Sequence, residues 1–273
     1  MENRPQTLDD VTTPQKGKTA GHNSELSNEE RERYARQLCL AGIGLEGQKR
    51  LRAARVLVVG AGGLGSPTLL YLAAAGVGTL GIVDFDCVEP SNLQRQICHT
   101  TSRVGTPKVQ SAARAIGELN PNVAVKTYDL MFTAANGPKL IEDYDIVVSA
   151  TDSYSSKFLI NDLCVAAAKP YVHGGIMAYG GQVLTYVPGS ACLRCLYGAP
   201  PTDAADNEAT RAGVLGSVAG LVGTIQATEV LKLIAHVGTP LTNKMLMVDA
   251  LTMQFTTMNI APSANCTVCG KGN

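Results

Sequence analysis

The stretch Arg55-Val-Leu-Val-Val-Gly-Ala-Gly-Gly-Leu-Gly-Ser66 decides the fold of this chain. It begins with a continuously apolar run, Val56 to Val59, which favours a parallel strand covered on both faces. The spacing Gly60-x-Gly62-x-x-Gly65 follows, and it brings backbone N–H groups and a helix N-terminus against phosphate. A helix through Tyr71 to Ala75 is expected next. The stretch therefore predicts the strand, turn and helix of a nucleotide-binding α/β unit.

A second strand is expected from Thr79 to Val83, and it ends in Asp84. A nucleotide-binding unit places the carboxylate that holds a ribose hydroxyl at about this point. The glycines do not distinguish among nucleotides, because a nicotinamide or flavin site has the same spacing. A turn needed only for tight packing of strand and helix is the structural alternative, and Asp84 favours the nucleotide.

Composition limits the class of protein. With 273 residues and 45% hydrophobic content, the chain has the material for one large domain, which we place at residues 27–273. Residues 1–26 are polar and are predicted to be a disordered tail. Basic and acidic residues are equal at 23 each, which argues against a nucleic-acid-binding surface. Met1 to Asn23 contains no signal peptide, so we expect a cytoplasmic protein with reduced cysteines.

The longest uncharged run extends from Ala212 to Thr228 and is ended by Glu229. Its length and its Gly216-x-x-x-Gly220 spacing would fit a marginal membrane helix. Because glycine, serine and threonine are frequent in it, we favour a buried helix in a soluble core or at a subunit interface. We therefore expect no interaction with a membrane.

The ordered part is predicted to begin at Ser27. Ser27 and Glu30 form a capping box, which starts a helix through Leu38. Arg33, Arg36 and Gln37 share one face of this helix. Arginines just before a nucleotide-binding core either reach phosphates or form a solvated face, and the spacing does not decide between these.

Polar side chains follow Asp84, where the segment after a strand lines the ligand crevice of an α/β sheet. Asn92, Arg95 and Gln96 are expected there, and Lys108 follows at the start of a helix that Pro107 opens and that extends through Leu119. An arginine and a lysine at one crevice suit a triphosphate better than a dinucleotide. The alternative is that both are ordinary surface charges.

Two further strands are expected at residues 123–128 and 145–149. The second is followed by Ala150, Thr151 and Asp152, so the Asp152 carboxylate should face the same crevice. A carboxylate beside phosphates is a ligand for Mg²⁺, which usually keeps several of its waters.

Six motifs in order resemble the ThiF/MoeB/HesA family of ubiquitin-activating-enzyme-like adenylyltransferases, which act on small sulfur-carrier proteins. They are Arg-Tyr-x-Arg-Gln (33–37), Gly-x-Gly-Gly-Leu-Gly (60–65), Asp-Phe-Asp (84–86), Ser-Asn-Leu-x-Arg-Gln (91–96), Gly-x-Pro-Lys (105–108) and Thr-Asp (151–152). The resemblance covers residues 27–273. It implies a doubly wound, Rossmann-like, mostly parallel sheet with a C-terminal antiparallel extension.

The resemblance also implies a site for ATP and Mg²⁺. The residues that it places around ATP are Gly62, Gly63, Asp84, Ser91, Asn92, Leu93, Gln94, Arg95, Lys108, Asp152 and Ser153. Asp152 would coordinate the magnesium ion, and Arg36 would enter the site of the partner subunit across a homodimer interface. Arg36, Arg95, Lys108 and Asp152 are the implied catalytic residues. Family members commonly have asparagine where this chain has Ser153.

Two Cys-x-x-Cys pairs lie in the second half of the chain, Cys192 with Cys195 and Cys266 with Cys269. Four thiolates fit a closed tetrahedral zinc site, which is structural because no coordination position remains open. Two reactive thiol pairs are the alternative. The resemblance implies structural zinc at these positions.

The segment Gly198–Thr210 is acidic and contains prolines, so a mobile loop is expected. In sulfur-transferring family members, this crossover loop carries a reactive cysteine three residues before Ala-Gly-Val. Here Ala209 stands at that distance from Ala212-Gly213-Val214, and residues 196–265 contain no cysteine. The chain stops four residues after Cys269, so no appended rhodanese-type domain is expected. We therefore expect a separate sulfur donor.

The resulting hypothesis is ATP-dependent adenylation of the C-terminal glycine carboxylate of a ubiquitin-like sulfur carrier, which prepares it for thiocarboxylate formation. One alternative is a dinucleotide-dependent oxidoreductase, which the glycine spacing and Asp84 support. Another is a non-catalytic interaction module of the same fold, at which Ser153 and Ala209 hint. We assign no catalytic role to the four histidines or to Cys39, Cys87, Cys98 and Cys164.

Overall fold

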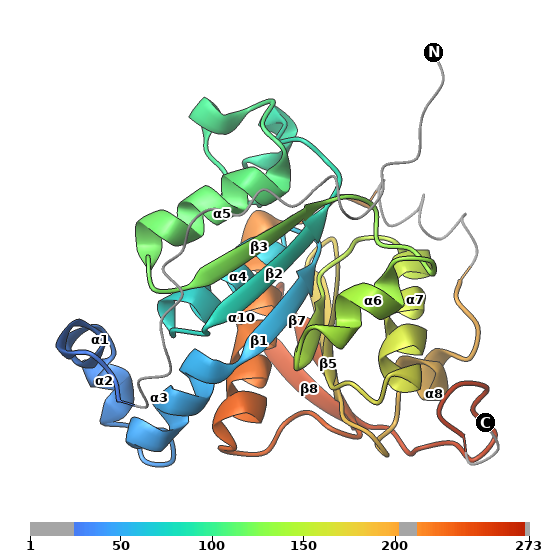
Figure 1. Ribbon diagram of the computed structural model, residues 1–273. Coiled ribbons are helices and arrows are strands. Elements are labelled where there is room, and N and C mark those ends of the chain that lie inside the picture. Colours follow the sequence, from blue (N-terminus) through green and yellow to red (C-terminus); the bar gives the residue numbers. More distant parts are fainter. Residues whose placement is uncertain (1–24, 202–211, 271–273) are drawn as a thin grey trace.

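The computed structural model describes residues 25–201 and 212–270. Most of the expected tail, and most of the expected loop at 198–210 with Ala209, therefore lie outside the described residues. Eight strands form one sheet in the order β3-β2-β1-β4-β5-β6-β7-β8 (Figure 1). The ladders from β3 to β5 are parallel, and those from β5 to β8 are antiparallel. The predicted fold class, a mostly parallel sheet with a C-terminal antiparallel extension, is confirmed.

The strands are β1 (Arg55–Val59), β2 (Thr79–Asp84), β3 (Ala124–Asp129), β4 (Ile146–Ser149), β5 (Tyr171–Met177), β6 (Gly180–Tyr186), β7 (Lys244–Asp249) and β8 (Gln254–Asn259). The α-helices are α1 (Asn28–Arg33), α2 (Ala35–Leu38), α3 (Gly44–Ala53), α4 (Gly65–Ala74), α5 (Lys108–Leu119), α6 (Gly137–Glu142), α7 (Tyr154–Ala166), α8 (Leu193–Tyr197) and α10 (Gly216–Ala235). Two 3-10 helices, η2 (Pro90–Asn92) and η3 (Thr101–Arg103), lie between β2 and α5.

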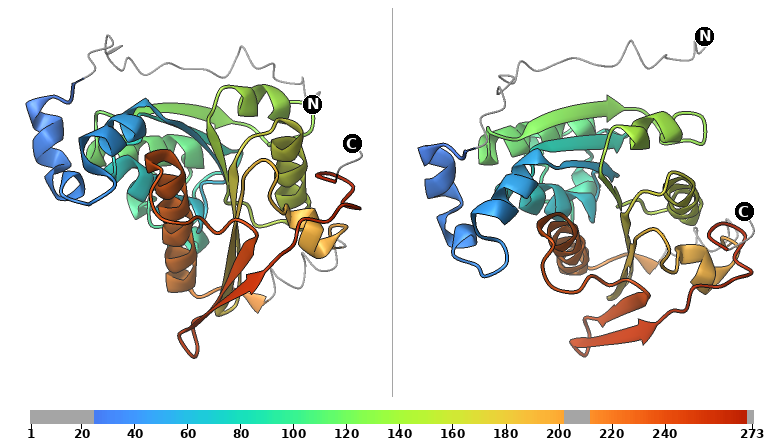
Figure 2. Two further views of the ribbon diagram at one scale, coloured as in Figure 1. Left: turned by 90° about the horizontal axis from the view of Figure 1, so that it is seen from below. Right: turned by 60° about the horizontal axis from the view of Figure 1, so that its bottom comes forward.

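The central parallel strands β1, β2 and β4 are covered on both faces, as their apolar runs require, whereas the edge strand β3 is mostly exposed or half-buried. In β1, Val56 and Val58 belong to the core that includes α4, α5 and α10, whereas Leu57 and Val59 belong to the core that includes α6 and α7. Side chains alternate along a strand, so β1 contributes to both layers. Figure 2 shows α10 and α7 on opposite sides of the sheet.

The helix α10 contains most of the long uncharged run. In the described part of the chain it is the one helix long and apolar enough to cross a membrane, and more than half of its apolar stretch is buried. Val218, Val222 and Val230 belong to the core, and α10 contacts α4 and β5. Its burial agrees with the core-helix interpretation.

The N-terminal prediction is partly wrong. The capping box at Ser27 is confirmed, but the helix ends at Arg33 and a second one begins at Ala35. Between them Tyr34 is buried. Its ring packs against Gly76, where an added Cβ would lie 2.5 Å from the ring, and its hydroxyl accepts a hydrogen bond from Asn120 (2.9 Å). The backbone of Tyr34 (ψ 13°) interrupts the helix at this anchor.

Candidate functional site

A cavity of about 630 Å³ lies at the carboxyl ends of β1, β2 and β4. The chain proceeds from β1 to β2 and β3 on one side, and β4 lies on the other side of β1. Ligands of open α/β sheets bind at such a switch point, and the volume falls in the range of about 300–1,000 Å³ typical of ligand pockets. Loops that follow each of these three strands line the cavity.

The glycine turn after β1 forms one wall. Gly60 has φ of +100°, and a Cβ there would lie 2.5 Å from the Ala150 carbonyl oxygen. A Cβ on Gly65 would lie 2.0 Å from the oxygen of Gly60. Larger residues would therefore push β1, β4 and the start of α4 apart. Gly62 and Gly63 line the cavity from this turn.

Asp84 lines the cavity from the end of β2. One of its carboxylate oxygens accepts from the Ala61 amide (2.8 Å), and the other accepts from the Asp86 amide (2.9 Å). Burial raises the pKa of the Asp84 carboxyl above its ordinary value, and these two bonds oppose that shift. A carboxylate has about four acceptor positions, so the group can still accept from a ribose hydroxyl.

Lys108 and Arg95 bring two positive charges to the same cavity. Lys108 is the first residue of α5, is 7% exposed, and donates to Asp86 (2.7 Å). Arg95 donates to the Ser91 carbonyl (3.1 Å), and its Cγ lies 3.4 Å from where a Cβ on Gly63 would be. The aliphatic part of the Arg95 side chain thus covers the glycine turn. The positive charges of Arg95 and Lys108 are both positioned to bind a polyanion in the cavity.

Asp152 and Ser153 line the cavity after β4. Asp152 is exposed, which suits a carboxylate that shares Mg²⁺ with phosphate oxygens and water. Ser153 is the N-cap of α7, and its Oγ accepts from the Ser156 amide (3.2 Å). Serine and asparagine are about equally good N-caps, so this capping role accommodates either residue.

Several expected residues lie elsewhere. Gln94 lines the cavity, but Ser91, Asn92 and Leu93 do not. The Asn92 side chain is buried and accepts from the Glu89 amide (3.1 Å), which fixes the turn before Arg95. Arg36 is exposed on α2 and does not line the cavity of its own chain. Figure 1 shows α2 beside α3, at the end of the sheet where β1 begins.

Sequence reasoning assigned no role to several lining residues, among them three apolar side chains and one cation. Phe85, Met131 and Phe132 follow the ends of β2 and β3, and Phe85 and Met131 are exposed. The rule that located Asp84 could have found them, because they too follow the carboxyl ends of strands. Lys157 lies in the first turns of α7 and donates to the Asp152 carbonyl (3.2 Å).

A second cavity of about 300 Å³ adjoins the first. The two share Asp152, Lys157 and Ile176 in their linings. The second is lined by β5 and β6, which contribute His173 and the glycines at 175, 180 and 181, and by residues of α7, α8 and β7. Burial lowers the pKa of His173 to about 3, so this imidazole is neutral. A smaller cavity thus continues from the nucleotide-sized one past Asp152 and Lys157.

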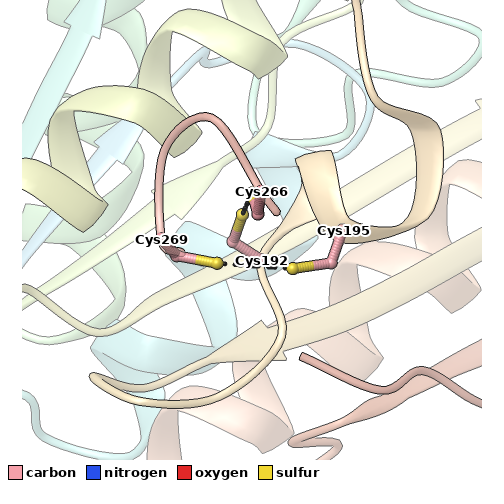
Figure 3. Close-up of side chains that lie close together, drawn as sticks. All are labelled: Cys192, Cys195, Cys266 and Cys269. Atoms are coloured by element: carbon pink, nitrogen blue, oxygen red, sulfur yellow. Dashed lines mark hydrogen bonds between the residues drawn. The ribbon is translucent and has the colours of Figure 1, made fainter. Parts of the chain in front are cut away.

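The two Cys-x-x-Cys pairs meet near the C-terminus (Figure 3). All four sulfur atoms lie within 4.8 Å of one another, with Cys192 and Cys266 at 3.7 Å and Cys195 and Cys269 at 3.3 Å. Four sulfurs at about 2.3 Å from a tetrahedral zinc ion are about 3.8 Å apart, so the donor set fits this metal. None of them lines either cavity, which agrees with a structural site.

We expect Cys269→Ser to release zinc and to lower the melting temperature, because structural zinc contributes directly to the free energy of folding. Elemental analysis and thermal unfolding measure the two effects. Cys39→Ser, at an exposed cysteine outside the cluster, should keep both properties. Freshly purified wild-type protein that contained no zinc, with these four thiols free, would contradict the assignment.

Comparison with known proteins agrees with this architecture. The model of the ThiF family matches residues 34–268. "Adenylyltransferase and sulfurtransferase MOCS3" of Arabidopsis thaliana is 45% identical over 90% of this chain and 53% of its own length. "Sulfur carrier protein adenylyltransferase" of Thermus thermophilus is 42% identical over 89% of this chain and 92% of its own length. The chain thus spans about half of the first relative and nearly all of the second.

A solved structure shows the same fold. It is E. coli MccB with ATP, which has a TM-score of 0.78 and 24% sequence identity over 90% of this chain and 76% of that one. At this identity the likeness concerns the fold alone. The family match over most of the chain, and the identity to its curated relatives, carry the assignment: the chain belongs to the ThiF family.

Proposed function

We propose that this protein uses ATP to adenylate the C-terminal glycine carboxylate of a ubiquitin-like sulfur-carrier protein, which prepares the carrier for thiocarboxylate formation. The observation that carries the proposal is one cavity that combines a glycine turn with Asp84, Arg95, Lys108 and Asp152. The names of two relatives support adenylyl transfer, and one of them names a sulfur carrier. Two cations favour a triphosphate over a dinucleotide.

In this reaction a carboxylate oxygen of the carrier attacks the α-phosphorus of ATP. The bond from that phosphorus to the bridging oxygen breaks, and pyrophosphate leaves with its electron pair. Arg95 and Lys108 would stabilise the negative charge that accumulates on the phosphates, and Asp84 would hold the ribose. Asp152 would hold Mg²⁺, which offsets the charge of the pyrophosphate. Such chemistry depends on positioning and on charge stabilisation, so no protein nucleophile is required.

The second cavity supports the choice of a carrier as the acceptor. Gly175, Gly180 and Gly181 are among its lining residues, and its volume of about 300 Å³ could hold the narrow, extended main chain of a glycine-ended tail. Lys157 lies where the two cavities meet, and it places a cation near the point at which the tail carboxylate would reach the α-phosphate. The tail would enter through the second cavity and end beside the nucleotide.

The assembly that we propose is a cytoplasmic homodimer in which Arg36 of each subunit completes the site of the partner subunit. The sulfur atom would come from a separate donor. Hydrosulfide delivered by that donor would attack the acyl carbon of the adenylate, AMP would leave, and the carrier would end in a thiocarboxylate. The lack of cysteine at residues 196–265 supports an outside donor.

Carrier-dependent exchange of labelled pyrophosphate into ATP tests the proposal directly. Purified protein with a cognate carrier should catalyse the exchange, and a carrier that lacks its terminal glycine should not support it. Exchange that did not depend on any ubiquitin-like carrier, or intrinsic nicotinamide binding without ATP turnover, would refute the proposed function.

A cysteine variant tests the separate sulfur donor. Replacing Cys39, Cys87, Cys98 and Cys164 together should leave adenylation intact and, with sulfide supplied, should still give the thiocarboxylate, which mass spectrometry detects as oxygen exchanged for sulfur. Cys98 and Cys164 are buried, so the melting temperature must be measured first. Loss of the thiocarboxylate with retained adenylation, restored by one cysteine, would identify that cysteine as a relay nucleophile.

A further inference from the structure

His99 is a buried histidine directly behind the glycine turn. It is 5% exposed and lies between η2 and η3, outside the linings of both cavities. Its Nε2 lies 2.9 Å from the Ala61 carbonyl oxygen, and its Nδ1 lies 2.9 Å from the Ser111 hydroxyl. The ring therefore connects the turn after β1 to the helix α5.

The contacts of His99 determine its tautomer. A carbonyl oxygen only accepts hydrogen bonds, so Nε2 carries the hydrogen and donates it to Ala61. Burial lowers the pKa of His99, and the nearby charges of Lys108 and Arg103 lower it further. The ring is therefore neutral, and its Nδ1 accepts from the hydroxyl of Ser111.

The hydrogen bond from His99 to the Ala61 carbonyl helps to orient the N–H group of Gly62. The Ala61 amide donates to Asp84 (2.8 Å) and its carbonyl accepts from His99, so the peptide groups on both sides of Ala61 are held. The described residues contain no cis peptide, and in a trans peptide the N–H points opposite to the C=O. The Gly62 N–H is therefore directed away from His99, and Gly62 lines the cavity.

The Gly62 and Gly63 amides are available to a ligand. Within residues 25–201 and 212–270, no protein group accepts a hydrogen bond from either of them. Free amides in a glycine turn before a helix form an anion site. The same ring also contacts α5 only three residues after Lys108, at Ser111. The His99 side chain thus connects the glycine turn, which presents the free amides, to the helix α5, which carries the buried Lys108.

We propose that His99 is a positioning residue that keeps the Gly62 amide and Lys108 in register to bind the phosphates of ATP. The inference rests on the nucleotide binding in the proposed function. His99 contacts no substrate itself and acts through Ala61 and Ser111. Loss of His99 should therefore weaken the binding of the phosphates and leave the binding of the nucleoside unchanged.

Two substitutions at one position separate this role from general stability. His99→Leu fills the space but cannot donate to Ala61. In His99→Gln, a side-chain amide nitrogen takes the place of Nε2 and can donate. Calorimetric titration with a non-hydrolysable ATP analogue and with adenosine gives the two affinities for wild type and for each variant.

We expect His99→Leu to bind the analogue about tenfold more weakly, the effect of about one lost hydrogen bond, with adenosine affinity unchanged. His99→Gln should recover the affinity for the analogue to within about threefold of wild type. Equal weakening for both ligands would show a structural role and overturn the inference, as would unchanged analogue binding by His99→Leu. If His99→Leu does not fold, Ser111→Ala must show the same selective loss.

The proposed function can fail separately. Wild-type protein that bound the analogue but gave no carrier-dependent exchange would refute adenylation of a carrier, and it would leave the role of His99 supported by the binding data. Wild-type protein that bound neither ligand would overturn both.

Discussion

Lys108→Ala, Arg95→Ala and Asp152→Ala are each expected to lower carrier-dependent ATP–pyrophosphate exchange by on the order of 100-fold. Each removes one preorganised charged group from the cavity, and a single such group is worth about this factor in other active sites. Lys108 has the most buried of these side chains, so its charge acts where water screens least. Initial rates of label exchange at saturating ATP and carrier measure the effect.

Arg114→Ala provides a matched control for Lys108→Ala. Arg114 lies on the same helix, is well exposed, and pairs with Glu118 four residues later, so its loss should change the exchange rate little. Circular dichroism and the melting temperature must show that each variant is folded. Near-normal exchange in all three cavity variants would refute the assignment of the phosphate site.

Homodimers of Arg36→Ala are expected to be nearly inactive, and mixing them with equally inactive Asp152→Ala homodimers should restore activity. In a mixed dimer, the subunit that carries Arg36→Ala keeps its own Asp152 and receives an intact Arg36 from its partner. One of the two sites is then complete. The structure motivates this test, because α2 lies beside α3 where β1 begins (Figure 1). The cavity of the same chain lies at the carboxyl end of β1.

The mixing experiment needs proof that subunits exchange, which differently tagged chains provide. Arg31→Ala, at an exposed arginine of α1 paired with Glu25, should retain activity as a homodimer. Activity that stays absent after proven exchange would show that Arg36 serves its own chain or does not serve the site.

Local sequence determined the elements around the glycine turn. The apolar run at Val56, the glycine spacing and the capping box at Ser27 act within a few residues, so β1, α4 and α1 begin close to where they were predicted. The rule that ligands bind at the carboxyl ends of parallel strands requires only that the end of each strand be identified. It correctly predicted that Asp84 and Asp152 lie at the same edge of the sheet. The Cys-x-x-Cys spacing likewise identified the four thiols that meet near the C-terminus.

Contacts between distant segments decided the rest. The helix break at Tyr34 depends on Gly76 and Asn120, which lie 42 and 86 residues further along the chain. The sulfurs of Cys192 and Cys266 meet across 74 residues only because β6, β7 and β8 fold beside one another. No sequence motif identified His99, because its proposed role depends on a hydrogen bond to the Ala61 carbonyl, 38 residues away. Sequence patterns report the residues that a local backbone geometry requires, whereas the hydrogen-bond partner of a buried side chain exists only after the chain has packed.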